Sequence, residues 1–225
     1  MELKQVANYQ VGRYLMYNKK SDKKELLTGK LFASYSVDYL GTYKREVVYY
    51  DTKDFFFADR GINIYTSADN YTRELIIRYD SEQVQRIEFL KNTPNFFKVP
   101  LNKKDSFSNF TAQINEAICQ VYPEGLHVNI DEMLREASPR VRILKKSEQY
   151  RVVNNKGLKT TIAFEDCNYF ECGGKSKFAQ ASLEVIGEKA VSKDEFNEFL
   201  RQLVIECPKI IKIESNELAV ARNGL

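Results

Sequence analysis

The 225-residue sequence has no tryptophan and only one histidine, His127. Its four cysteines are Cys119, Cys167, Cys172 and Cys207. None of these cysteines shows the Cys-x-x-Cys spacing of zinc sites, and the histidine has no ligand-like neighbour at helical spacing. The pattern argues against a metal cluster, and we expect free thiols.

Long apolar runs are also missing. No stretch approaches the roughly 20 apolar residues that cross a bilayer, and residues 1–8 carry Glu2 and Lys4 in place of the apolar core of a signal peptide. Neither sign of charge dominates, because 34 basic residues stand against 31 acidic ones, for a net charge of +3. We therefore expect a cytoplasmic protein with no membrane segment and no general affinity for nucleic acid.

Strand-forming aromatic residues are plentiful, with fourteen Tyr and fourteen Phe. The length and the 43% hydrophobic content suffice for one large domain, which we expect to span residues 1–225. Periodicity indicates about eight strands, and their short connections require antiparallel pairing. We therefore predict an α+β fold, an eight-stranded antiparallel β-barrel with helices packed outside, because closure leaves no exposed sheet edge.

The expected elements follow from apolar spacing and turn residues. Strands are expected at 9–17, from about 43 to 52, and at 62–67, 72–79, 84–91, 141–153, 158–164, around 169 and at 178–186. Helices are expected at 22–35, from 105 to 121, and at 129–137, 192–206 and 215–223. The segment 92–104, which carries two prolines and three lysines, is predicted to be a loop.

One stretch organises these elements. A strand ends in the corner Tyr50-Asp51-Thr52, a short helical turn runs to Gly61, and a hairpin follows with the turn Ala68-Asp69-Asn70. Its second strand ends in the basic residue Arg78. This order and spacing resembles the CYTH domain of the triphosphate tunnel metalloenzymes. The resemblance continues in a basic strand from Arg140 to Lys146, an acidic-ended strand and a strand that bears Glu184.

The resemblance implies a tunnel that binds a phosphorylated small molecule or polyphosphate, with Mg²⁺ or Mn²⁺ as the cofactor. Alternate side chains of a strand face the inside of such a barrel. By position, the phosphate-binding candidates are Arg78, Arg86, Arg142, Lys145 and Lys146. The metal-binding candidates are Glu88, Glu165, Asp166 and Glu184, while Glu74 and Arg140 are further inward candidates. Catalytic residues are not identified.

Several positions depart from the family pattern. The first strand has Gln10, Gly12 and Tyr14 where family enzymes have Glu-x-Glu-x-Lys, and Tyr65 and Ser67 replace two arginines. In the last helix, Asn216 replaces a lysine. Loss of one preorganised electrostatic contact costs roughly 10²–10³ in rate. We therefore expect the metal-dependent triphosphatase chemistry to be lost or altered, while a polyanion can still bind.

Two other interpretations stay open. The chain can be a divergent triphosphatase or nucleotidyl cyclase that uses the acidic candidates for metal, which fails if Tyr14 and Tyr65 fill the tunnel. It can also be a non-catalytic scaffold whose protein partner binds the helices or the loop 92–104. In that case the basic strand residues are solvated and paired, and Tyr50-Asp51-Thr52 is a structural corner.

Overall fold

A computed structural model describes residues 4–5, 10–16, 18–79, 96–102, 104–122, 129–154, 158–187, 191–213 and 217–224. Ten strands pair antiparallel in the order β1-β6-β5-β4-β3-β7-β8-β9-β2-β10. They are β1 (Lys4–Gln5), β2 (Gln10–Met16), β3 (Tyr35–Asp51), β4 (Ile62–Ala68), β5 (Arg73–Tyr79), β6 (Phe96–Pro100), β7 (Ser138–Asn154), β8 (Lys159–Glu171), β9 (Lys177–Gly187) and β10 (Ile211–Lys212).

The prediction of an α+β protein with an antiparallel sheet is confirmed, but the count of eight strands was too low. β6 lies inside the predicted loop, because Phe97 and Val99 alternate into a fully buried row. β8 is one strand where two were predicted, since it continues through Glu165 and Asp166. The predicted strand 84–91 lies outside the described residues. Among the residues that are described, no pairing joins β1 to β10, so the observed strand order is open.

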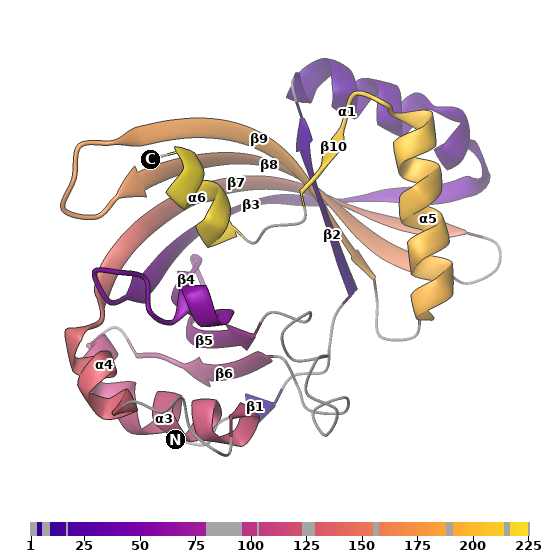
Figure 1. The fold of residues 1–225 in the computed structure, drawn as a ribbon. Helices are drawn as coiled ribbons and strands as arrows, with labels where there is room; N and C mark the ends of the chain where they lie inside the picture. Colours follow the sequence, from indigo (N-terminus) through magenta and orange to yellow (C-terminus); the bar gives the residue numbers. More distant parts are fainter. Residues whose placement is uncertain are drawn as a thin grey trace.

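The sheet is strongly curved. Figure 1 shows β7, β8 and β9 arching over one side of a concave face, with β4, β5 and β6 on the other. The helices are α1 (Lys19–Thr28), α3 (Thr111–Val121), α4 (Ile130–Glu136), α5 (Lys193–Glu206) and α6 (Glu217–Gly224). α3 and α4 lie beyond β6 on the outer side, α1 and α5 cover the far end of the long strands, and α6 lies within the curve.

Helices lie in all five predicted regions, with shifted bounds. The predicted helix 22–35 corresponds to α1, which ends at Thr28 and is followed by the 3₁₀ turn Lys30–Ser34. Asn18 caps α1, because its side chain accepts a hydrogen bond from the Ser21 N–H and its own N–H donates one of 3.0 Å to the buried Asp22 carboxylate. A 3₁₀ turn, Phe107–Phe110, precedes α3. Within the part of the chain that is described, no helix combines the length and the apolar character needed to cross a membrane.

Alternation separates a packed outer face from an inner face in β4 to β6. Ile64, Ile77 and Phe97 are buried in a core with Ile114 and Ile118 of α3. The alternate residues of the same strands point to the concave side. Each strand thus contributes one row of side chains to the core and one to the interior of the curve.

A β-bulge lets β3 serve two different cores. The register between β3 and β7 shifts by one residue between Tyr39 and Gly41, and Gly41 has a φ of 133°. A one-residue insertion exchanges the two faces of a strand. As a result, Val37 packs against the core beside α1 and α5, whereas Val47 belongs to the core beside α6.

The corner Tyr50-Asp51-Thr52 after β3 is stabilised by local hydrogen bonds, as expected for a structural corner. The Asp51 carboxylate accepts hydrogen bonds from the N–H groups of Thr52 (2.8 Å), Phe57 (3.0 Å) and Ala58 (2.9 Å). The 3₁₀ turn η2 (Ala58–Arg60) then ends at Gly61, whose φ of 71° few other residues adopt. The corner therefore fixes where the chain turns from β3 into β4.

Candidate ligand cavity

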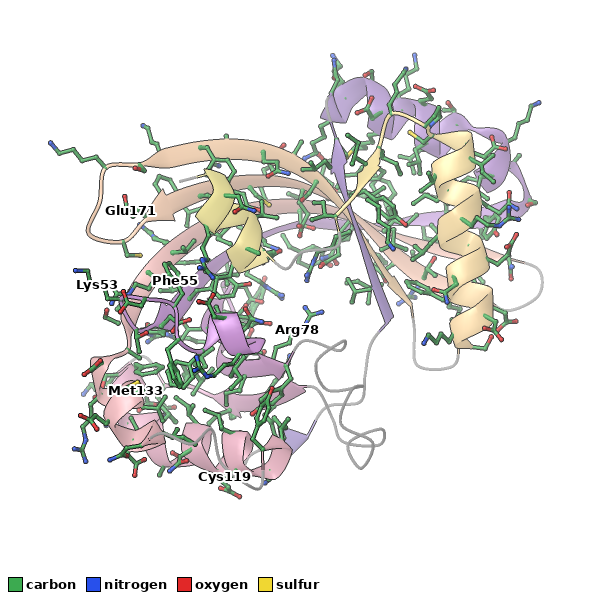
Figure 2. The ribbon with its side chains drawn as sticks, in the orientation of Figure 1. Lys53, Phe55, Arg78, Cys119, Met133 and Glu171 are labelled. Carbon is green, nitrogen blue, oxygen red and sulfur yellow. The ribbon has the colours of Figure 1, made fainter. Side chains whose placement is uncertain are left out.

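A cavity of about 370 Å³ lies on the concave side of the sheet. Its lining residues come from the strands β2 to β7, from β9 and from α6. They are Val11, Arg13, Arg45, Val47, Tyr65, Ser67, Glu74, Ile76, Arg78, Lys98, Lys145, Glu184, Ile186 and Glu217. On each strand the lining positions are two residues apart, as alternation requires. Figure 2 shows Arg78 extending from β5 into the space enclosed by the curve.

Lys145 of β7 is the centre of a buried ion-pair network. Its Nζ lies 3.3 Å from Oε2 of Glu165 on β8, and it also forms an ion pair with Glu217 of α6. The Tyr49 hydroxyl donates a hydrogen bond of 3.3 Å to the Glu217 carboxylate. The side chain of Lys145 is 9% exposed, so its partners are all internal. The network ties β3, β7, β8 and α6 together.

A second ion pair lies on the adjoining strands. Arg13 of β2 donates a hydrogen bond of 2.9 Å from Nε to Oε1 of Glu184 on β9, directly opposite it in the strand register. On the other side of the cavity, Lys98 of β6 lies 2.9 Å from Glu74 of β5. Each carboxylate of the cavity lining thus has a basic partner.

Two arginines complete the basic lining. Arg45 is exposed and lies 3.7 Å from Asp69 at its nearest approach. Arg78 is half-buried and forms no ion pair of 4.0 Å or less with another described residue. Arg78 is therefore the guanidinium in the described lining that is most available to an anion.

Burial disfavours the charged form of every group in the network, and the neighbouring charges determine the net direction of each pKa shift. Burial works to lower the pKa of Lys145, but Glu165 and Glu217 outweigh it and hold that pKa well above its ordinary value. Burial works to raise the pKa of Glu217, but Lys145 and Arg13 outweigh it and lower that pKa to about 2. These groups are therefore charged at neutral pH.

Glu165 and Glu184 shift in opposite directions. Burial raises the pKa of Glu165 in spite of Lys145, with Glu184 and Glu217 adding repulsion. Burial likewise disfavours ionised Glu184, but Arg13 and Lys145 prevail and lower its pKa. Glu184 is consequently ionised at neutral pH, whereas Glu165 is the carboxylate of the network that is protonated most easily.

The thiol beside Glu165 is not an activated nucleophile. Burial and the nearby Glu165 raise the pKa of Cys167 to about 12, so the thiol is protonated at neutral pH. Its Sγ lies 3.7 Å from the Ser182 hydroxyl, which donates a hydrogen bond of 3.3 Å to Glu165. Cys167 and Ser182 therefore act as neutral neighbours of the network.

The structure brings together some of the predicted phosphate-binding residues. Arg78 and Lys145 line the cavity. Lys146, the next residue of β7, is exposed on the opposite face, and exposed Arg142 forms an ion pair with Glu46. Arg86 lies outside the described residues. Of the two adjacent lysines, Lys145 therefore faces the cavity and Lys146 faces away from it.

The predicted metal-binding residues do not converge. Glu184 lines the cavity and pairs with Arg13, while Glu165 is buried against Lys145. Asp166 faces the other side of β8, where it lies 2.7 Å from Lys19 of α1. Glu88 lies outside the described residues. Of the two further inward candidates, Glu74 lines the cavity, whereas the Arg140 Nε donates to the carbonyls of Asp51 and Thr52.

The described carboxylates of the cavity do not fit a divalent metal. Within the described ranges, no group of three or more His, Cys, Asp or Glu residues is placed to hold a metal ion. Mg²⁺ and Mn²⁺ need carboxylate oxygens that are free to coordinate. Here Lys or Arg side chains engage the carboxylates of the cavity lining, so we derive no step that uses a metal.

Sequence reasoning missed Arg13 and Glu217. The comparison with the family pattern placed Gln10, Gly12 and Tyr14 inward, whereas Val11 and Arg13 of β2 line the cavity. Tyr14 is buried in the core beside α1 and α5, so it does not fill the cavity. The hydrophobic Tyr14 and Met16 were the signal that the even positions of this strand face the helices.

The fold is similar over its full length to solved structures. A candidate adenylate cyclase from Bacillus halodurans has a TM-score of 0.56 at 7% identity, over 98% of both chains. HpAC1 from Hippeastrum, a candidate adenylyl cyclase described as having a dominant triphosphatase activity, has a TM-score of 0.53 at 12% identity, over 100% of this chain and 96% of that one. No family model and no curated protein matches the sequence. The likeness shows that this chain shares its fold with these two structures.

Proposed function

We propose that residues 1–225 form one CYTH-like tunnel domain that binds a phosphorylated ligand in the cavity, between β5 on one side and β7 on the other. The observation that carries this proposal is the position of Arg78, a half-buried guanidinium that lines the cavity and forms no ion pair of 4.0 Å or less with another described residue. Such a group matches a phosphate oxygen pair, because guanidinium donors are arranged in a rigid fork.

Lys145 and Arg13 supply the supporting positive charge. Both are held in fixed positions by the buried network, and the fold places them on β7 and β2, across the cavity from β5. A preorganised cationic site of this kind binds an anion without first having to order its own side chains. Arg142 and Lys146 have no part in this site, since they lie on the outer face.

Metal-dependent triphosphate hydrolysis is lost or altered in this proposal. The lining residues of β2 are Val11 and Arg13, neither of which is a carboxylate. Glu74 and Glu184 pair with Lys98 and Arg13. A metal would have to displace a buried ion pair before it could be coordinated, which leaves the freed Lys or Arg charge uncompensated.

Titration calorimetry of inorganic phosphate, tripolyphosphate and nucleotides against Arg78→Gln tests the binding proposal. We expect at least one of these compounds to bind the wild-type protein and to bind Arg78→Gln about 10- to 100-fold more weakly, because a hydrogen bond to a charged group is lost. Arg142→Gln is the matched control and should bind like the wild type. Equal losses in both variants, or no binding of any phosphate, would overturn the proposal and favour a scaffold that binds a protein partner.

A divergent triphosphatase or nucleotidyl cyclase is the second candidate. The full-length likeness to HpAC1 favours it, because that protein is described as having a dominant triphosphatase activity. A phosphate-release assay with tripolyphosphate and nucleoside triphosphates, with Mg²⁺ and with Mn²⁺, separates the two candidates. Clear turnover that Glu184→Gln abolishes would establish the enzyme, whereas absence of turnover in a protein that binds phosphate supports the proposed function.

A further inference from the structure

We propose that the cavity takes an organic phosphate of low charge, a phosphate monoester joined to an apolar or aromatic group, in preference to a bare chain of phosphates. This inference rests on the proposed function and narrows its ligand. It depends on three features of the described lining, which are its apolar side chains, its resident carboxylates and the fixed position of α6.

The apolar side chains lie next to one another across the strands. Val11 of β2 is opposite Ile186 of β9, and Tyr65 of β4 is opposite Ile76 of β5. Val47 of β3 adds a further apolar side chain. Phosphate oxygens gain nothing from such surfaces, whereas an apolar or aromatic group gains about 25 cal/mol for each Å² that it buries. The lining therefore has places for a ligand that is only partly a phosphate.

The resident carboxylates limit how much negative charge the cavity accepts. Arg13, Arg45, Arg78, Lys98 and Lys145 supply positive charge to the described lining, and Glu74, Glu184 and Glu217 oppose it. A monoester carries about −1.5 to −2 at neutral pH. A chain of three phosphates carries more charge and would bring further oxygens close to these glutamates. Like charges at such distances repel, so the glutamates select against the longer chain.

Glu217 is a permanent part of the lining because α6 is anchored. Leu218 and Ala221 of this helix are buried in the core beside β7 and β8. At the end of the helix, Arg222 lies 2.6 Å from Asp59 and stacks over the ring of Phe55, 4.4 Å from its centroid. A ligand therefore meets the cavity with the Glu217 charge in place.

The position of the phosphate follows from these contacts. Arg78 and Ile76 are neighbours on the inner row of β5, and half-buried Tyr65 lies opposite Ile76, so one ligand can place its phosphate at Arg78 and its apolar part against Tyr65 and Ile76. A cavity of about 370 Å³ lies within the range of roughly 300–1,000 Å³ that is typical of small-molecule sites. A nucleoside monophosphate or an aryl phosphate has the required chemistry.

Titration calorimetry with inorganic phosphate, tripolyphosphate, adenosine 5′-monophosphate and phenyl phosphate tests the inference. We expect an organic monophosphate to bind at least tenfold more tightly than either inorganic compound. Ile186→Thr should weaken the organic monophosphates more than inorganic phosphate and so remove most of that preference. Tighter binding of tripolyphosphate would overturn the inference and keep the proposed function, whereas absence of binding by all four compounds would overturn both.

Glu217→Gln gives an independent readout. Removal of this fixed charge should improve tripolyphosphate binding about tenfold more than it improves binding of adenosine 5′-monophosphate. Glu171→Gln is the matched control, because Glu171 is exposed at the end of β8 and does not line the cavity. It should leave the affinity ratio unchanged. Equal changes for the two ligands in Glu217→Gln, in a variant whose thermal unfolding shows that it folds, would contradict the inference.

Discussion

The long strands β8 and β9 have two faces with different kinds of side chain. On the face covered by α1 and α5, the side chains Phe164, Leu183 and Val185 are fully buried among apolar neighbours. On the opposite face, their sequence neighbours Glu165 and Glu184 belong to the charged network around Lys145 of β7, and Lys145 and Glu184 line the cavity. One face is an apolar core, and the other carries a set of paired charges.

The difference shows how one sheet separates stability from binding. Apolar burial on the face covered by α1 and α5 stabilises the fold without any specific partner. Buried charges contribute little net stability, because desolvation offsets their attraction. They are nevertheless fixed in place, and fixed charges are what an anion site requires. We therefore expect stability to depend most on the helix-covered face and ligand affinity to depend on the charged face.

The largest effect should come from the helix-covered face. Phe164→Ala removes a fully buried ring and should lower the free energy of unfolding by about 3–5 kcal/mol, measured by urea denaturation. Tyr71→Ala, at a residue that is 92% exposed, is the control and should change that energy by less than about 0.5 kcal/mol. A similar small change for Phe164→Ala would mean that the helix-covered face is not the main core.

Next in size is loss of the central cation. Lys145→Met leaves Glu165 and Glu217 buried without their common partner, which should cost about 3 kcal/mol in unfolding free energy. The cost should shrink as the pH falls, because protonation removes the uncompensated carboxylate charges. Lys146→Met changes the same residue type on the exposed face and should be nearly neutral. Equal effects of the two substitutions would refute the buried network.

Acid should weaken the charged face selectively. The pKa of Glu217 is about 2 in the folded protein against an ordinary 4.5, so its stabilising contribution is complete above pH 4.5 and is lost as the pH falls toward 2. Each pKa unit corresponds to about 1.4 kcal/mol, which bounds this loss at roughly 3 kcal/mol. Glu165 acts in the opposite sense, because its raised pKa makes protonation stabilise the fold.

Urea unfolding of the wild type and of Glu217→Gln across pH 2–6 measures this effect. The variant should show a shallower loss of stability between pH 4.5 and pH 2, since the titrating carboxylate is absent. Identical pH profiles would show that Glu217 is not held as an anion in the folded protein, and the charge argument for the cavity would fail with it.

The smallest effect should come from the exposed end of α6. Arg222→Gln breaks an ion pair whose side chains are 36% and 52% exposed, and exposed pairs contribute about 0–1 kcal/mol. Thermal unfolding should therefore shift little, because Leu218 and Ala221 still hold the helix. A loss above about 2 kcal/mol would indicate that charge, and not apolar packing, fixes α6.

Local chemistry made parts of this fold predictable from the sequence. The corner at Asp51, the turn at Asp69 and the glycine at Gly61 act on their immediate neighbours, and each was expected where it occurs. The helix predicted at 192–206 is α5, and Ser192 caps it through a reciprocal pair of hydrogen bonds with Glu195. Such features need no information from distant parts of the chain.

The face of the sheet on which each side chain lies was harder to predict from the sequence. It depends on strand register, and one-residue differences exchange the two faces. The bulge at Gly41 and the inward position of Arg13 both result from register, and neither has a local signature. Glu217 comes to Lys145 from 72 residues away in the sequence, so only the tertiary fold brings them together. Of the predicted binding residues, Arg78, Lys145 and Glu184 line the cavity, and their roles stay predictions.

A crystal structure of the protein grown with adenosine 5′-monophosphate tests the central claim most directly. The account predicts electron density for a phosphate within hydrogen-bond distance of the Arg78 guanidinium, with the rest of the ligand against Ile76 and Ile186. Density for the ligand on the outer face, beside Arg142 and Lys146, with no ligand in the cavity would contradict it.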